Sequence, residues 1–157
     1  MEVPTLGARG QGWVWLQFAL IAGIVGAGLL PPAWPAGVAR LLDVVGAALA
    51  LGGAGLAVWA VRALGRSLTP YPAPPARATL VDGGPYGWVR HPIYAAGLAF
   101  LGGYSLVASP CALVLTVVLG IVWALKASVE ERFLRARFGG YEGYAERVRH
   151  RLVPGLY

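Results

Sequence analysis

The chain has 157 residues, a net charge of +6, and a composition that is 57% hydrophobic and only 13% charged. Soluble domains usually carry about 25% charged residues, so this composition excludes an ordinary soluble domain and indicates a membrane protein. Cys111 is the single cysteine, which excludes an intrachain disulfide and a cysteine-cluster metal site. We therefore predict no metal centre.

Three uncharged segments indicate where the chain crosses the membrane. Trp13–Leu30 and Val44–Val61 contain 18 residues each, and Ile93–Leu125 contains 33, interrupted by Ser109-Pro110. A spanning helix needs roughly 20 apolar residues, and fewer within a bundle. A signal peptide is the alternative for the first segment, although its apolar region is usually shorter. We predict one all-α integral membrane domain with four transmembrane helices, the last two a hairpin, at about residues 13–30, 43–62, 92–108 and 111–128.

The basic residues predict the orientation of these spans. With a cytoplasmic N-terminus, twelve of the thirteen lysines and arginines lie on the inner side, and Arg40 alone lies outside. This is the positive-inside distribution, so we expect both termini in the cytoplasm, in a bacterial inner membrane or its equivalent. The positive charge then reflects topology and contact with the lipid bilayer, and we predict no binding to nucleic acid.

The second span is rich in small residues, including Gly46, Ala50, Gly53 and Ala57. Small residues four positions apart allow helix backbones to approach closely in lipid. Packing within the bundle explains this spacing, and the same kind of face is suited to a homodimer.

Residues 65–91 form a long predicted cytoplasmic loop. Its five prolines exclude a long helix, and side chains such as Tyr71, Leu80 and Trp88 make it too apolar for a disordered linker. Loops of this length are usually functional lids, so we predict a loop that covers a ligand site.

The last span is predicted to continue beyond the membrane. Its helical pattern runs from Ala112 to about Phe138, which is longer than the hydrocarbon core requires. In the cytoplasmic segment 129–157, Gly139-Gly140 should end this helix. A short amphipathic helix is then expected over Tyr141–His150, with Pro154 after it.

The sequence Arg90-His91-Pro92 stands at the start of the third span. Proline suits the first turn of a helix, so the free N–H groups of that turn would lie beside Arg90. A helix N-terminus with an adjacent cation favours a carboxylate or phosphate. Alternatively, Arg90 only anchors the span at the lipid headgroups.

Glu130 and Glu131 are unusual because acidic residues are costly near a membrane. Helix-stabilising pairs four residues apart, Lys126 with Glu130 and Glu131 with Arg135, are one explanation. Adjacent helix residues diverge by about 100°, so one carboxylate can face a pocket while its neighbour faces elsewhere.

Aromatic side chains surround the same predicted site. Tyr71, Tyr86 and Tyr94 provide faces that attract cations, whereas Tyr141 and Tyr144 are expected to be interfacial anchors. A zwitterionic, partly aromatic and positively charged cofactor would suit the anion site, the carboxylate and these rings together.

Several motifs, over about residues 66–154, resemble the isoprenylcysteine carboxyl methyltransferase family and the related phospholipid N-methyltransferases. Both are integral membrane enzymes that use S-adenosylmethionine. The motifs are Thr79-Leu80-Val81, Gly84-Pro85-Tyr86, Arg90-His91-Pro92-Ile93-Tyr94, Glu130-Glu131, Phe138-Gly139 and Tyr141-x-x-Tyr144.

The resemblance implies S-adenosylmethionine-dependent methyl transfer to a lipophilic or small acceptor with a carboxylate, amine or thiol. Lys126 stands where the family has an arginine that handles the substrate. Lysine keeps the positive charge but lacks the planar guanidinium that can form two parallel hydrogen bonds. Together with Glu131 and Arg90, it is a catalytic candidate. The implied cofactor-binding residues are Tyr71, Ala78, Thr79, Leu80, Val81, Tyr86, His91, Pro92, Ile93, Tyr94 and Glu130.

Two other readings fit parts of the sequence. Sterol and steroid reductases carry a similar Arg-His-Pro region but use NADPH. A non-catalytic membrane subunit would use the Arg-His-Pro and Glu-Glu pairs only as anchors.

Overall fold

The computed structural model describes residues 3–31, 33–153 and 155, and no strand occurs among them. This confirms the predicted all-α fold. The elements are α1 (Gln11–Gly28), α2 (Ala36–Leu64), η1 (Gly65–Ser67), η2 (Gly84–Gly87), α3 (Pro92–Ala108), α4 (Pro110–Arg137) and α5 (Tyr141–Arg147).

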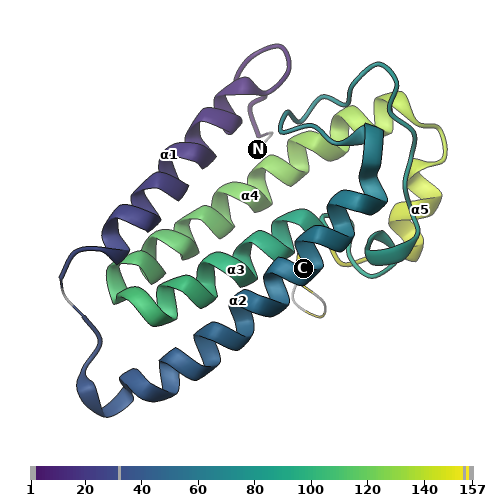
Figure 1. Cartoon of the computed structure of the whole chain (residues 1–157). Helices are drawn as coiled ribbons and strands as arrows, with labels where there is room; N and C mark the ends of the chain where they lie inside the picture. The colour runs from purple at the N-terminus through teal and green to yellow at the C-terminus, as the bar shows by residue number, and fades with distance from the viewer. Residues whose placement is uncertain (1–2, 32, 154, 156–157) are drawn as a thin grey trace.

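The four long helices lie side by side in the order α1, α4, α3, α2 (Figure 1). Helix α2 packs most extensively on α3, α3 packs on α4, and α4 packs on α1. The first two helices of the chain therefore lie at opposite edges of the bundle, and the α3–α4 hairpin separates them.

Helices α1, α2 and α4 are long and apolar enough to cross a membrane, whereas α3 is an apolar helix of 17 residues. Large apolar side chains point outward along these helices, such as Trp15 (74% exposed) and Leu51 (76% exposed). Lipid chains would cover such side chains, which are unfavourable in water. The protein is an integral membrane protein, and the bounds of its membrane-embedded segments stay predictions.

Small residues bring α2 close to α3. A Cβ atom added to Gly53 would lie 2.5 Å from the Phe100 nitrogen and 2.8 Å from the Ala96 oxygen. Only glycine permits this approach of two backbones. This part of the small-residue face packs inside the chain, whereas a Cβ added to Gly52 or Gly55 would meet no atom within 4 Å. The predicted homodimer stays a prediction.

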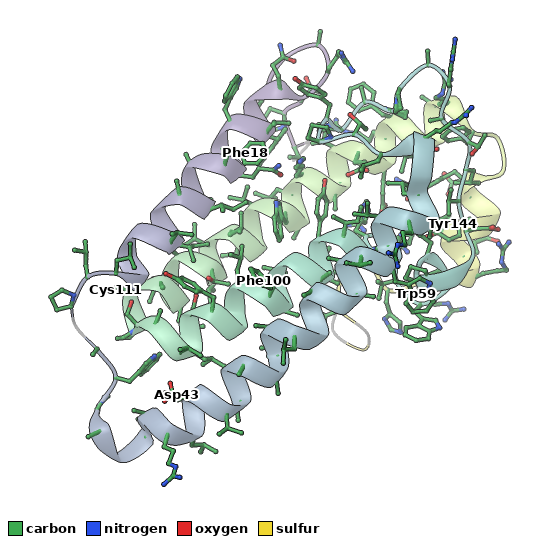
Figure 2. All side chains as sticks on the ribbon, in the orientation of Figure 1. Phe18, Asp43, Trp59, Phe100, Cys111 and Tyr144 are labelled. Atoms are coloured by element: carbon green, nitrogen blue, oxygen red, sulfur yellow. The ribbon has the colours of Figure 1, made fainter. Side chains whose placement is uncertain are left out.

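Ser109 organises the turn between α3 and α4. Its hydroxyl accepts a hydrogen bond from the Ala112 nitrogen at 3.2 Å and donates to the Ala27 oxygen at 2.9 Å. It therefore caps α4, and Pro110 occupies the first helical turn, where proline is favoured. Cys111 and Asp43 lie towards this end of the bundle, and Tyr144 lies at the other end (Figure 2).

The C-terminal segment departs from the prediction. Helix α4 runs over Pro110–Arg137 as expected, but α5 ends at Arg147 rather than near His150. The chain beyond α5 pairs instead with the start of α3: the Arg90 and His91 nitrogens donate to the His150 and Arg151 oxygens at 2.9 and 2.8 Å. These bonds replace those of a longer helix. Pro154 lies outside the described residues.

Candidate functional site

A cavity of about 370 Å³ lies where the 65–91 loop meets α3, α4 and α5, which is within the usual size range of small-molecule sites. Every candidate residue except Tyr71, Pro92 and Glu131 lines it. Those that do are Ala78, Thr79, Leu80, Val81, Tyr86, Arg90, His91, Ile93, Tyr94, Lys126 and Glu130.

The loop forms one wall of the cavity and is held at several points. The Ser67 hydroxyl donates to the Thr79 oxygen at 3.2 Å and accepts from the Thr79 nitrogen at 3.0 Å. Asp82 forms an exposed ion pair of 2.6 Å with Arg147 at the end of α5. The predicted lid is therefore held by hydrogen bonds between Ser67 and Thr79 and by an ion pair to α5.

Tyr86 and Tyr144 join the loop to α5. The Tyr144 hydroxyl donates to the Tyr86 backbone oxygen at 2.9 Å. Burial raises the pKa of both phenols well above their ordinary value, so both stay protonated in the physiological range. Tyr144 and Tyr141 are 3% and 1% exposed and line the cavity, so the prediction that they are interfacial anchors is wrong.

His91, Tyr94 and Trp123 form a stack of rings along another wall. Their centroids are 5.5 Å apart between His91 and Tyr94, with planes at 6°, and 5.3 Å apart between Tyr94 and Trp123. Pro92 begins α3 as predicted, but it is buried away from the cavity. Its position fixes where the helix starts and brings His91 and Tyr94 to the site.

Glu130 faces the cavity beside this stack. Its Oε2 atom accepts a hydrogen bond from the Tyr94 hydroxyl at 2.8 Å, and its side chain is 24% exposed. The site thus contains a carboxylate that a ligand can reach, with the stacked rings of His91, Tyr94 and Trp123 next to it.

Glu131 points the other way and is completely buried. Its carboxylate lies 2.8 Å from Arg90, 3.2 Å from Arg151, and 3.3 Å from both Arg135 and His91. These contacts give Glu131 a structural role behind the wall of the cavity, where it holds Arg90, His91, Arg135 and Arg151 together. Its predicted catalytic role would require direct access to a ligand, which this position does not provide.

Arg90 lines the cavity, but its guanidinium is largely engaged by protein. Besides Glu131, it donates to the backbone oxygens of Val148 and Arg149 at 2.7 and 2.9 Å. Its side chain is only 8% exposed, which argues against the alternative of an anchor in the lipid headgroups.

Lys126 is 1% exposed and lies at the cavity wall. Its Nζ atom donates to Gln17 Oε1 at 2.6 Å and to the Pro70 oxygen at 2.9 Å, and it stands 5.3 Å from the centre of the Tyr94 ring. Its hydrogen bonds therefore join α4 to α1 and to the loop.

Gln17 was not predicted from the sequence. Its Oε1 atom also accepts from the Trp123 indole at 3.1 Å, and the residue is buried at the cavity wall. An isolated glutamine in an apolar helix is the only signal that could have indicated it. Tyr71 lies off the cavity, with Arg9 stacked 4.7 Å above its ring.

A match to the phospholipid methyltransferase family covers residues 41–140, which is more than half of the chain. The chain belongs to this family. It is therefore a membrane methyltransferase by family. No curated protein matches the chain.

The part of the chain that matches the phospholipid methyltransferase family contains the loop, α3 and α4. Gln17, Tyr141 and Tyr144 lie outside it but complete the cavity wall. Among the described residues, no group of histidine, cysteine and acidic side chains is arranged to hold a metal ion.

Proposed function

We propose that the protein transfers a methyl group from S-adenosylmethionine to a lipophilic or small acceptor at the inner face of the membrane. The acceptor atom belongs to a carboxylate, an amine or a thiol. The observation that carries this proposal is that Glu130, Tyr94, His91 and Lys126 line one cavity and all lie within the region that matches the family.

The residues of the cavity fit the cofactor. Glu130 offers a carboxylate to a cationic group, and the stacked rings of His91, Tyr94 and Trp123 line the cavity beside it. Tyr141 adds a buried hydroxyl without a partner in the described part of the protein. Bound S-adenosylmethionine would supply a methyl group on a positively charged sulfur. The loop segment 78–81 would cover it and limit the access of water.

The chain's own contribution is to position the reactants and to provide fixed charges. Holding two reactants in line supplies a large part of the rate enhancement in transfers of this kind. Lys126, held by Gln17 and Pro70, places a positive charge that suits an acceptor carboxylate. Glu130 suits an acceptor amine, whose positive charge grows during the transfer.

We further propose that the cavity opens towards the cytoplasm, with both termini on that side. The N-terminal segment and the loop lie at one end of the bundle, where Arg132 donates to the Val3 oxygen and the Ala73 nitrogen donates to the Arg9 oxygen. The basic residues of this end support the cytoplasmic side.

Calorimetric binding of S-adenosylhomocysteine to the detergent-purified protein tests this proposal. The wild type is expected to bind, and Glu130→Ala is expected to lose most of the affinity, because the cavity then lacks its accessible carboxylate. Glu146→Ala is the matched control, since this glutamate is exposed on α5 and does not line the cavity.

A folded wild type that binds NADPH but not S-adenosylhomocysteine would replace this proposal with the reductase. Binding of neither ligand would favour the non-catalytic subunit. Equal affinity of wild type and Glu130→Ala would remove Glu130 from the site.

A further inference from the structure

Tyr141 has a buried hydroxyl group that no group in the described part of the protein satisfies. Its side chain is 1% exposed and lines the cavity, and among the described residues its Oη atom is the buried side-chain polar atom without a hydrogen-bond partner. Buried polar groups in folded proteins are nearly always hydrogen-bonded. A hydroxyl left unpaired at a cavity wall therefore points to a ligand that completes it.

The surroundings of Tyr141 indicate what kind of ligand group lies there. The Tyr144 ring meets it edge-on at 5.6 Å, and the aliphatic and aromatic side chains of Leu80, Leu134 and Phe138 pack around the pair. All of these residues also line the cavity. The Arg135 guanidinium lies 5.6 Å from the centre of the Tyr141 ring but does not line the cavity. The cavity lining at this end is therefore mainly apolar and aromatic and suits a flat heterocyclic ring with a few polar atoms.

Another part of the cavity has a different character. Glu130 and Lys126 supply charges there, about one and two turns before Leu134 on α4 and next to the ring of Tyr94. The amino-acid half of S-adenosylmethionine is charged and suits that part, whereas its nucleoside half is uncharged and partly aromatic. The two parts of the cavity thus differ in the same way as the two halves of the cofactor.

We infer that the α4–α5 end of the cavity binds the nucleoside half of the cofactor and that the Tyr141 hydroxyl forms a hydrogen bond to it. This inference rests on the proposed function. A phenol hydroxyl both donates and accepts, so it can pair with a ring nitrogen, an amino group or a ribose hydroxyl. The role assigned to Tyr141 is ligand binding, since Tyr144 already joins α5 to the loop.

Tyr141→Phe and Tyr144→Phe are a matched pair of variants, because each removes one buried hydroxyl from α5. In Tyr141→Phe the ligand-free protein loses an unsatisfied group, so its thermal midpoint is expected to stay the same or rise. In Tyr144→Phe it loses a hydrogen bond of 2.9 Å to the Tyr86 oxygen, so its midpoint is expected to fall.

The experiment combines these midpoints with calorimetric binding of S-adenosylhomocysteine and of 5′-methylthioadenosine, which keeps the nucleoside but lacks the amino-acid group. Tyr141→Phe is expected to weaken both ligands by a similar factor, roughly three- to tenfold, as for one lost hydrogen bond.

Three results would overturn the inference while leaving the proposed function intact. The first is an unchanged affinity of Tyr141→Phe for S-adenosylhomocysteine. The second is a Tyr141→Phe variant that binds S-adenosylhomocysteine more weakly but binds 5′-methylthioadenosine as well as the wild type does. The third is a thermal midpoint of Tyr141→Phe that falls as much as that of Tyr144→Phe. Failure of the wild type to bind S-adenosylhomocysteine would instead reject the proposed function, and the inference with it.

Discussion

Replacing Glu131 by alanine should destabilise the protein far more than replacing its neighbour Glu130. The Glu131 carboxylate is fully buried between three arginines and His91, and its shortest contact is 2.8 Å to Arg90. Removing one partner from a buried ion pair typically costs about 3–5 kcal/mol, because the remaining charges stay buried without compensation. Since whole domains are stable by only about 5–15 kcal/mol, this loss is large.

The two control variants have smaller expected effects. Glu130 is 24% exposed and accepts one hydrogen bond from Tyr94, so Glu130→Ala should cost about 1 kcal/mol of stability while removing ligand affinity. Glu142 is 65% exposed and pairs with Arg135 at the surface, so Glu142→Ala should cost less than about 1 kcal/mol.

The assay is reversible unfolding of the three variants in mixed micelles, followed by helix content, with the free energy of unfolding extrapolated to zero denaturing detergent. A Glu131→Ala protein within about 1 kcal/mol of the wild type would refute the anchoring role inferred from its contacts.

Three further experiments test other parts of the structure. Gly53→Ala should lower the thermal midpoint because its Cβ would meet α3 backbone atoms at 2.5 and 2.8 Å. Gly55→Ala is the control and should be neutral or slightly stabilising, because its Cβ would meet no atom within 4 Å. Equal effects of the two substitutions would argue against the close α2–α3 contact. In sealed inverted membrane vesicles, a membrane-impermeant maleimide should label Glu146→Cys in a cysteine-free background but not wild-type Cys111. The reason is that α5, which carries Glu146, and Cys111 lie at opposite ends of the bundle (Figures 1 and 2), and the reverse labelling pattern would invert the proposed topology. Gln17→Leu should lower the free energy of unfolding by about 1–3 kcal/mol, because buried Lys126 then loses a hydrogen-bond acceptor at 2.6 Å. It should also weaken the binding of S-adenosylhomocysteine. Unchanged stability and affinity would show that the contact is dispensable.

Much of the fold follows from simple rules of sequence. The uncharged segments predicted the long helices, and the divergence of adjacent helix residues predicted that Glu130 and Glu131 face different ways, as they do. What the sequence could not provide is the order of the helices in space. The chain places α1 beside α4 rather than beside α2, because side-chain packing, and not connectivity, decides which faces meet.

The same limit explains the residues that sequence reasoning misplaced. In the sequence, Gln17 is an isolated polar residue in an apolar helix. Its contact with Lys126 exists only because α1 packs beside α4. Tyrosine is a common interfacial anchor in membrane proteins, which is why the sequence predicts that role for Tyr141 and Tyr144. In the structure α5 packs against the loop and buries both side chains. Local pattern identified the motifs, whereas long-range packing determined which side chains complete the cavity.

Photolabelling tests the central claim most directly. Ultraviolet irradiation of the purified protein with methyl-tritiated S-adenosylmethionine, followed by trypsin, is expected to label peptides from the cavity wall. The peptide over residues 78–90, released by cleavage after Arg77 and Arg90, contains the loop segment and Tyr86 that line the cavity. Excess S-adenosylhomocysteine should abolish the label and NADPH should not. Label confined to peptides outside the cavity, or label that S-adenosylhomocysteine does not displace, would contradict the account.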